Sequence, residues 1–217
     1  MEIDAFILVG GRSSRFGSDK ANIHFDGIPL LERTVRTIRA ALDSKRITLI
    51  AANDTQFTGS AAFLISLPVV YDIHEDRGPF GAVHAALANA QTEWAFITAC
   101  DFPFVPAELI ERLVANISSN VDAVAPIQPD GRLQPLVALY RVKPVLNFVN
   151  ETLTNNRSSP SVKVIFEQLR STLVTFETLA DIPNAGDIFL NLNTPADLRC
   201  ANEIAGDKFE CNGAVMS

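Results

Sequence analysis

The chain has 217 residues and a formal net charge of −7, and 47% of its residues are hydrophobic while 20% are charged. This composition argues against disorder, and the acidic balance argues against nucleic-acid binding, because attraction to a phosphate backbone needs a broad basic surface. No apolar run approaches the roughly 20 residues of a membrane span and no secretion signal is recognisable, so we expect a cytoplasmic protein without membrane association.

Strands and helices are predicted to alternate from the first residues onward. The apolar run at residues 5–9 ends at two glycines and is typical of a strand buried on both faces of a sheet. A helix is predicted from Pro29, and a second strand follows at 46–52. The buried stripe of that helix is expected at Leu31, Val35, Ile38 and Leu42.

The same alternation continues through the rest of the chain. Further strands are predicted at 69–72, 94–99 and 172–176, and further helices at 79–90, 106–117 and 162–169. Residues 122–127 and 133–140 flank an Asp-Gly turn signal, which predicts an antiparallel hairpin. The polar stretch 150–161 predicts a mobile loop near a site.

These elements predict an α/β fold: one doubly wound, Rossmann-like sheet, mixed but mostly parallel, with helices on both faces. We expect a single domain over residues 1–205 and a C-terminal tail over 206–217. In such sheets, ligands bind beyond the carboxyl ends of the strands. A ligand site is therefore expected among the residues that follow the predicted strands.

The glycine-rich motif at residues 8–21, LVGGRSSRFGSDKA, follows the first predicted strand. Its glycines allow backbone N–H groups to approach phosphate oxygens, and Arg12, Arg15 and Lys20 add positive charge that the chain otherwise lacks. The spacing fits neither a Walker A loop nor GxGxxG. We interpret the motif as a triphosphate cradle. The alternative is a strand-to-helix turn with solvated basic side chains.

Three polar residues follow later strands. Asp101 comes after the strand at 94–99, and one such carboxylate with substrate phosphates suits Mg²⁺; the alternative is a cap for the helix near Pro106. Asp72 could reach the base or ribose of a nucleotide, or could be a solvated strand end. Asn53 follows the second strand, where an amide can satisfy both donor and acceptor groups of guanine.

The glycine-rich motif resembles that of the molybdenum cofactor guanylyltransferases (MobA-type), within the wider nucleotidyltransferase group. The family pattern L-x-G-G-x-S-x-R-x-G-x-D-K is met at Leu8, Gly10, Gly11, Ser13, Arg15, Gly17, Asp19 and Lys20. The segments CDFP, GPFG and LNLNTPADL are similar to the family's C-D-x-P, G-P-x-x-G and N-x-N-T-P-E/D. Of the family's N-x-N after the second strand, this chain matches the second asparagine, Asn53.

The resemblance implies transfer of GMP from GTP to the terminal phosphate of molybdopterin, with release of pyrophosphate and with Mg²⁺ as cofactor. It assigns catalytic roles to Arg15, Lys20 and Asp101, with Asp101 as metal ligand. The nucleotide-binding residues that we expect are Leu8, Val9, Gly10, Gly11, Arg12, Ser13, Lys20, Asn53, Asp72 and Asp101. Those expected to bind the second substrate are Gly78, Gly81, Asn191 and Asn193.

Several alternatives stay open at this point. The Asn-Thr-Pro sequence that follows Asn191 is equally well explained as a helix N-cap with proline in the first turn. A cytidylyltransferase acting on the same cofactor or on another phosphorylated metabolite would use a similar phosphate cradle, and so would a nucleotide-binding module without catalytic activity. We expect a monomer, with transient contacts to cofactor-delivery proteins or target molybdoenzymes.

Overall fold

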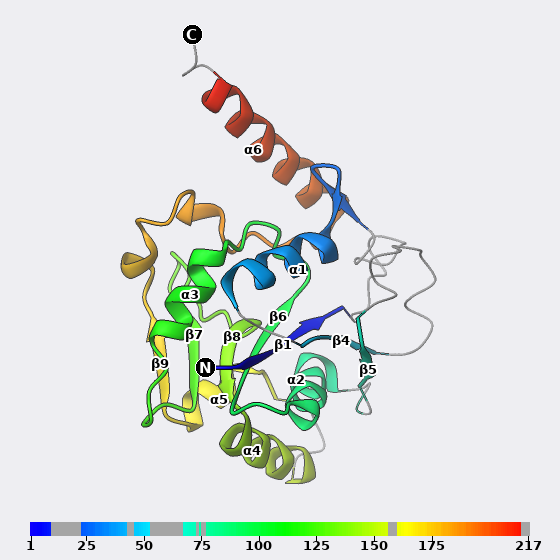
Figure 1. Ribbon diagram of the computed structural model, residues 1–217, viewed down its shortest axis with the longest axis vertical. Helices are drawn as coiled ribbons and strands as arrows, with labels where there is room; N and C mark the ends of the chain where they lie inside the picture. Colours follow the sequence, from blue (N-terminus) through cyan, green and yellow to red (C-terminus); the bar gives the residue numbers. More distant parts are fainter. Residues whose placement is uncertain are drawn as a thin grey trace.

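The computed structural model describes residues 1–9, 23–42, 46–52, 67–72, 74, 77–155 and 160–213, with the backbone alone for 206–213. Within them lies a seven-stranded sheet of order β5-β4-β1-β6-β8-β7-β9 (Figure 1). Its strands are β1 (Ile3–Leu8), β4 (Ile47–Ala51), β5 (Val69–Tyr71), β6 (Trp94–Ala99), β7 (Ala123–Pro126), β8 (Val137–Arg141) and β9 (Ser171–Val174). All neighbouring strands pair in parallel except β8, which is antiparallel to β6 and β7. The prediction of a mixed, mostly parallel sheet is confirmed.

Helices cover both faces of this sheet (Figure 1). The helices α1 (Leu30–Ala41) and α3 (Ala107–Ala115) pack on one face. The opposite face is covered by α2 (Gly78–Asn89), α4 (Val142–Asn155) and α5 (Lys163–Gln168). Every residue of β1 is buried, because a central strand of a doubly wound sheet meets a helical layer on each side. The predicted stripe of α1 is buried at Leu31, Val35, Ile38 and Leu42.

A small hairpin between the glycine-rich motif and α1 was not expected. It consists of β2 (His24–Phe25) and β3 (Ile28–Pro29), which pair in an antiparallel manner. Asp26 and Gly27, which join the strands, both have positive φ, the conformation of a type I′ turn. The Asp-Gly pair is the signal by which the hairpin can be found in the sequence, although two-residue strands are too short to show any periodicity.

The prediction of a loop over residues 150–161 is wrong in its first half. Residues 150–155 form the last turns of α4, while 156–159 lie outside the described residues. The helix begins directly after β8 and has Pro144 in its first turn, where the missing N–H costs no hydrogen bond. Val142, Val145 and Val149 are its buried residues. The polar side chains of its end lie on the remaining, solvent-facing side.

The C-terminal part of the chain consists of two short 3-10 helices and one long helix. These are η5 (Phe176–Leu179), η6 (Ala185–Asp187) and α6 (Pro195–Gly213), which extends away from the sheet (Figure 1). The helix α6 crosses the expected domain boundary at residue 205 without a break, and the separate tail stays a prediction. Among the described residues, no helix combines the length and apolarity that crossing a bilayer requires.

Candidate functional site

The carboxyl ends of β1 and β6 lie side by side at the point where the strand order reverses. From β1 the chain proceeds outward to β4 and β5, and it then returns to the other side of β1 to form β6. The backbone N–H of Cys100 donates to the carbonyl of Leu8 over 3.3 Å, and that of Val9 donates to the carbonyl of Ile50 over 2.9 Å. Such a topological switch point is where open α/β sheets bind their ligands.

Asp101 lies at this switch point, immediately after Cys100. Its side chain is partly buried and its Oδ1 atom is shielded from solvent. The helix α3 begins at Ala107 with Pro106 as N-cap and without a side-chain capping hydrogen bond, so the alternative that Asp101 caps α3 is wrong. A carboxylate oxygen at the switch point is a hard ligand for Mg²⁺, which is usually coordinated by one or two carboxylates together with substrate phosphates and water.

Asp72 lies at the same edge of the sheet, two strands beyond β1. Its backbone N–H donates to the carbonyl of Ala51 over 2.8 Å, and its Oδ1 accepts a 2.7 Å hydrogen bond from the N–H of His74. The residue is 7% exposed, so the alternative of a solvated strand end is wrong. Burial raises the pKa of this carboxyl, while the hydrogen bond and the nearby imidazoles of His74 and His84 oppose the change.

Gly81 allows close packing between α2 and the segment after β5. A Cβ at this position of α2 would lie 2.8 Å from Oδ2 of Asp72 and 2.8 Å from the carbonyl oxygen of His74. The missing side chain therefore lets the segment after β5 pack against the helix. Gly78 opens α2 with φ of +54°, a conformation that a side chain disfavours, and has open space around it. Their predicted contact with substrate stays a prediction.

His74 and His84 are residues near Asp72 for which the sequence offers no functional signal. Their rings meet edge to face with centroids 5.0 Å apart. Nε2 of His84 lies 2.9 Å from Oδ1 of Asn150, which connects α2 to α4. This position between two helices gives His84 a packing role.

The segment 191–193 lies beside Asp101. The backbone N–H of Leu192 donates to the carbonyl of Asp101 over 2.9 Å, so two parts of the chain that are 91 residues apart meet at the switch point. Asn191 lines a cavity of about 390 Å³ together with Gln128, Arg132, Phe189 and Cys200, among others. The turn after β7 contributes to this lining, and that turn is at the same edge of the sheet as Asp101.

The residues after Asn193 also form the N-cap that the sequence left as an alternative. Thr194 Oγ1 accepts a hydrogen bond from the N–H of Asp197 over 3.2 Å, and Asp197 Oδ2 accepts from the N–H groups of Asn193 and Thr194 over 2.9 and 2.8 Å. This reciprocal pattern is a capping box, with Pro195 at the first helical position. The cap fixes the N-terminus of α6 and thereby the asparagine segment before it.

The remaining predicted residues lie outside the described part of the chain. They are Gly10, Gly11, Arg12, Ser13, Arg15, Lys20 and Asn53. Leu8 and Val9, the predicted start of the cradle, are buried at the end of β1. The described structure thus brings together Leu8, Val9, Asp101 and Asn191 at the switch point, and it places Asp72 farther along the same edge.

The raised pKa of Asp72 predicts a pH-dependent effect of Asp72→Asn. A carboxyl whose pKa is higher in the folded protein stabilises the fold below its unfolded pKa, and this contribution is lost as the pH rises through the folded value. At pH 7 the charged carboxylate therefore weakens the fold, and asparagine can still accept from His74. We expect a higher Tm for Asp72→Asn than for the natural chain at pH 7, and a vanishing difference near pH 4.

The control for this measurement is Asp181→Asn. Asp181 forms an ion pair with Arg112, and the hydrogen bond from that guanidinium lowers the pKa of the carboxyl. Thermal unfolding at several pH values should therefore show the opposite sign, a loss of Tm at pH 7 that disappears in acid. A lower Tm of Asp72→Asn at pH 7 would contradict the assignment of a destabilising buried charge.

Comparison with known proteins places this geometry in a family. Residues 5–171 match the model of the MobA-like NTP transferase domain. A probable molybdenum cofactor guanylyltransferase of Carboxydothermus hydrogenoformans is 33% identical over 88% of this chain and 90% of its own length. A molybdenum cofactor guanylyltransferase of a Shewanella species is 34% identical over 90% of this chain and 92% of its own.

Solved structures agree with the sequence relatives. Molybdopterin-guanine dinucleotide biosynthesis protein A from Archaeoglobus fulgidus superposes with a TM-score of 0.74 and 25% identity, covering 95% of this chain and 100% of that one. The 2-C-methyl-D-erythritol 4-phosphate cytidylyltransferase of Thermus thermophilus shares the fold with a TM-score of 0.67 and 17% identity, covering 95% of this chain and 100% of that one. The chain therefore belongs to the MobA-like NTP transferase family and is a nucleotidyltransferase.

Proposed function

We propose that this chain transfers GMP from GTP to the terminal phosphate of molybdopterin, giving the guanine dinucleotide form of the cofactor and pyrophosphate. A P–O bond forms between the pterin phosphate and the α-phosphorus, and the bond between the α- and β-phosphates breaks. The observation that carries this proposal is the meeting of Leu8, Asp101 and Leu192 at the switch point through backbone hydrogen bonds. It joins the start of the glycine-rich motif, a carboxylate and the predicted pterin-side segment.

The edge of the sheet offers two carboxylates for the two ends of a nucleotide. Asp72 follows β5 and Asp101 follows β6, and the strand order places β4 and β1 between them. Three strand spacings amount to roughly 14 Å. A nucleoside triphosphate laid across the ends of β1 and β4 would place its base or ribose at Asp72 and its phosphates at Asp101.

Asp101 would hold Mg²⁺ together with phosphate oxygens. When bound, this ion would neutralise negative charge on the triphosphate. The chain's own part is to orient the carboxylate, and the hydrogen bonds of Cys100 to Leu8 and of Leu192 to the Asp101 carbonyl do so from both sides. A phosphate nucleophile is ionised at neutral pH, so the reaction needs positioning and charge neutralisation rather than a strong general base.

The cavity beside Asn191 is where the second substrate would bind. Its volume of about 390 Å³ falls in the range of small-molecule sites. Arg132, which is paired with Asp130 of the same lining, supplies a guanidinium, Gln128 and Asn191 supply amides, and Phe189 offers an apolar face. A pterin has both a polar edge and a flat ring, and this lining suits both.

Pyrophosphate release tests the proposal directly. The purified chain is incubated with Mg²⁺, molybdopterin and either GTP, CTP or ATP, and the cofactor product is identified by mass. We expect product with GTP. Product with CTP alone would replace the proposal by a cytidylyl transfer, and tight nucleotide binding without product would make the chain a non-catalytic module.

Lys20→Ala tests the cradle within the same assay. In the resemblance, Lys20 contacts the triphosphate, and loss of a charged contact costs roughly 1.5–3 kcal/mol, or about 10- to 100-fold. We expect a higher KM for GTP and a lower kcat, measured by pyrophosphate release. Lys143→Ala, on the exposed surface of α4, is the matched control and should behave as the natural chain. Unchanged kinetics of Lys20→Ala would remove Lys20 from the site.

A further inference from the structure

A small hydrophobic cluster is separate from the cores on the two faces of the sheet and includes residues next to the switch point. Its buried members are Ile23, Phe25, Leu30, Leu192 and Ala201, and Phe104, Leu198 and Ala205 pack against them. They come from the β2–β3 hairpin, the start of α1, the segment after Asp101, the asparagine segment and α6. We call these residues the hairpin cluster. By side-chain packing it joins the hairpin to the segment after Asp101 and to the asparagine segment, two parts of the chain that a backbone hydrogen bond also joins at the site.

Phe25 is the central side chain of the hairpin cluster. It is 1% exposed, and its ring meets that of Phe104 edge to face, with centroids 5.2 Å apart and an interplanar angle of 73°. Phe104 is three residues after Asp101. An isolated two-stranded hairpin is marginally stable, so β2 and β3 depend on this packing for their place.

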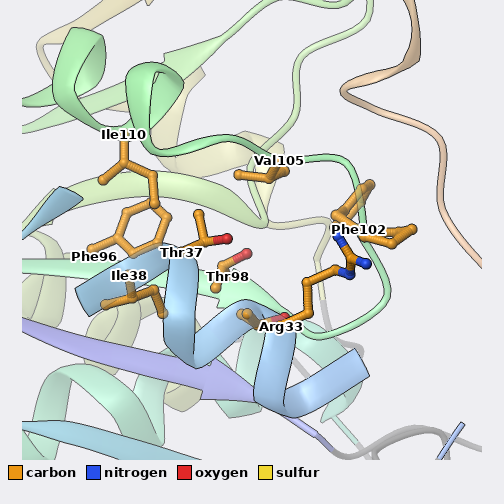
Figure 2. A pocket seen from close by; sticks show the side chains of 10 residues that line it. Arg33, Thr37, Ile38, Phe96, Thr98, Phe102, Val105 and Ile110 are labelled. Atoms are coloured by element: carbon orange, nitrogen blue, oxygen red, sulfur yellow. The ribbon is translucent and has the colours of Figure 1, made fainter. Parts of the chain in front are cut away.

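Arg33 of α1 lies over the same ring. Its guanidinium carbon lies 4.8 Å from the centroid of Phe25, and its Nη2 lies 3.5 Å from Oδ2 of Asp26. Figure 2 shows the Arg33 side chain reaching from α1 toward Phe102, and both residues line the same small cavity. Arg33 therefore contacts the hairpin and approaches the segment that follows Asp101.

We propose that Phe25 is a positioning residue for Asp101, because its ring, in contact with both Arg33 and Phe104, fixes the segment 101–104 against the hairpin that follows the glycine-rich motif. The hairpin begins a few residues after Lys20, so the same ring anchors the chain where it leaves the motif. Leu192, in the hairpin cluster, donates the hydrogen bond to the Asp101 carbonyl. Phe25 thus acts on the reaction through Asp101 and does not touch the substrate.

This inference rests on the proposed nucleotidyl transfer, and its test separates a positioning role from a general loss of stability. The variant is Phe25→Ala, with Phe25→Leu as the conservative replacement and Phe104→Ala as a second removal of the same contact. The matched control is Phe166→Ala of α5, another buried ring, which meets Tyr140 edge to face at 5.5 Å in the core on the α2–α4 face. All four are assayed below their own Tm.

We expect Phe25→Ala and Phe104→Ala to lower kcat about 10- to 100-fold, since a displacement of about 1 Å in a positioned group has an effect of this size. The Mg²⁺ concentration for half-maximal rate should rise, while the KM for nucleotide should change less than kcat. Phe25→Leu should recover most of the rate. Phe166→Ala should lose stability and keep kcat within about twofold of the natural chain.

Amide hydrogen exchange provides a measurement that needs no activity. In Phe25→Ala the N–H of Leu192 should exchange about tenfold faster or more, because its bond to the Asp101 carbonyl opens more readily. The exchange rate of the Leu192 N–H should be unchanged in Phe166→Ala. The positioning role is overturned if Phe25→Ala retains both the kcat of Phe166→Ala and the Leu192 protection of the natural chain. If the natural chain forms no product with any nucleotide, the proposed function is contradicted instead. The exchange of the Leu192 N–H then decides by itself whether Phe25 positions the segment at Asp101.

Discussion

Asp101→Asn is expected to lower kcat by about two orders of magnitude or more while the protein stays folded. Asparagine has nearly the same shape, and the hydrogen bond from Leu192 uses the backbone carbonyl, so the surrounding contacts persist. What is lost is the negative charge that would hold Mg²⁺ at the switch point. Steady-state pyrophosphate release gives kcat, and thermal unfolding gives the Tm of the same sample.

The control for this variant is a carboxylate away from the switch point. Asp181→Asn removes one exposed charge from its ion pair with Arg112 and should leave kcat unchanged. A titration with Mn²⁺ in place of Mg²⁺ adds a second readout, because Asp101→Asn should raise the concentration needed for half-maximal rate. Normal pyrophosphate release by Asp101→Asn would remove Asp101 from the metal site.

Gly81→Ala is expected to destabilise the fold by about 1–3 kcal/mol, the usual cost of overpacking, and to weaken nucleotide binding. The new Cβ would overlap Oδ2 of Asp72 and the carbonyl of His74, each 2.8 Å away, so the segment after β5 must shift from α2. Because the carbonyl belongs to the backbone, the overlap cannot be relieved by a side-chain rotation alone. In the proposed function this shift displaces Asp72 from the base or ribose.

Gly186→Ala is the matched control, because a Cβ there would meet no atom within 4 Å. Denaturant unfolding measures the free energy, and calorimetric titration of GTP measures the affinity. We expect a loss in both for Gly81→Ala and near-natural values for Gly186→Ala. An unchanged free energy of unfolding would show that the segment holding Asp72 adapts without cost. A weaker fold with unchanged affinity would instead separate Asp72 from the nucleotide.

Local patterns in the sequence were sufficient for most of the sheet. The continuous apolar run of β1 predicted a strand buried on both faces, the run of β6 predicted a strand, and the stripe from Leu31 to Leu42 predicted α1 with its buried residues. Strand and helix formation is predictable here because it depends on the spacing of apolar residues that are close together in the sequence. The α4 helix was missed although Val142, Val145 and Val149 are spaced as one helical face, because the stretch 150–161, which is polar and contains Pro160, suggested a loop.

The contacts of the site were less predictable, because they are formed between residues far apart in the sequence. The sequence around Gly81 does not indicate that its missing side chain makes room for Asp72. The sequence around Leu192 does not indicate that its N–H donates to the carbonyl of Asp101. The same holds for Phe25, because an apolar residue beside an Asp-Gly turn gives no sign that its ring contacts Arg33 and Phe104. Motif resemblance identified the polar residues but not the packing that places them.

The central claim is that one crevice, at the carboxyl ends of β1 and β6, binds the triphosphate with its divalent ion. The most direct measurement is a crystal structure with a non-reactive GTP analogue and Mn²⁺, in which anomalous scattering locates the ion. We expect an anomalous peak within direct coordination distance of a carboxylate oxygen of Asp101, and the ion should be coordinated by phosphate oxygens as well. A nucleotide bound elsewhere, or an ion that does not contact Asp101, would contradict it.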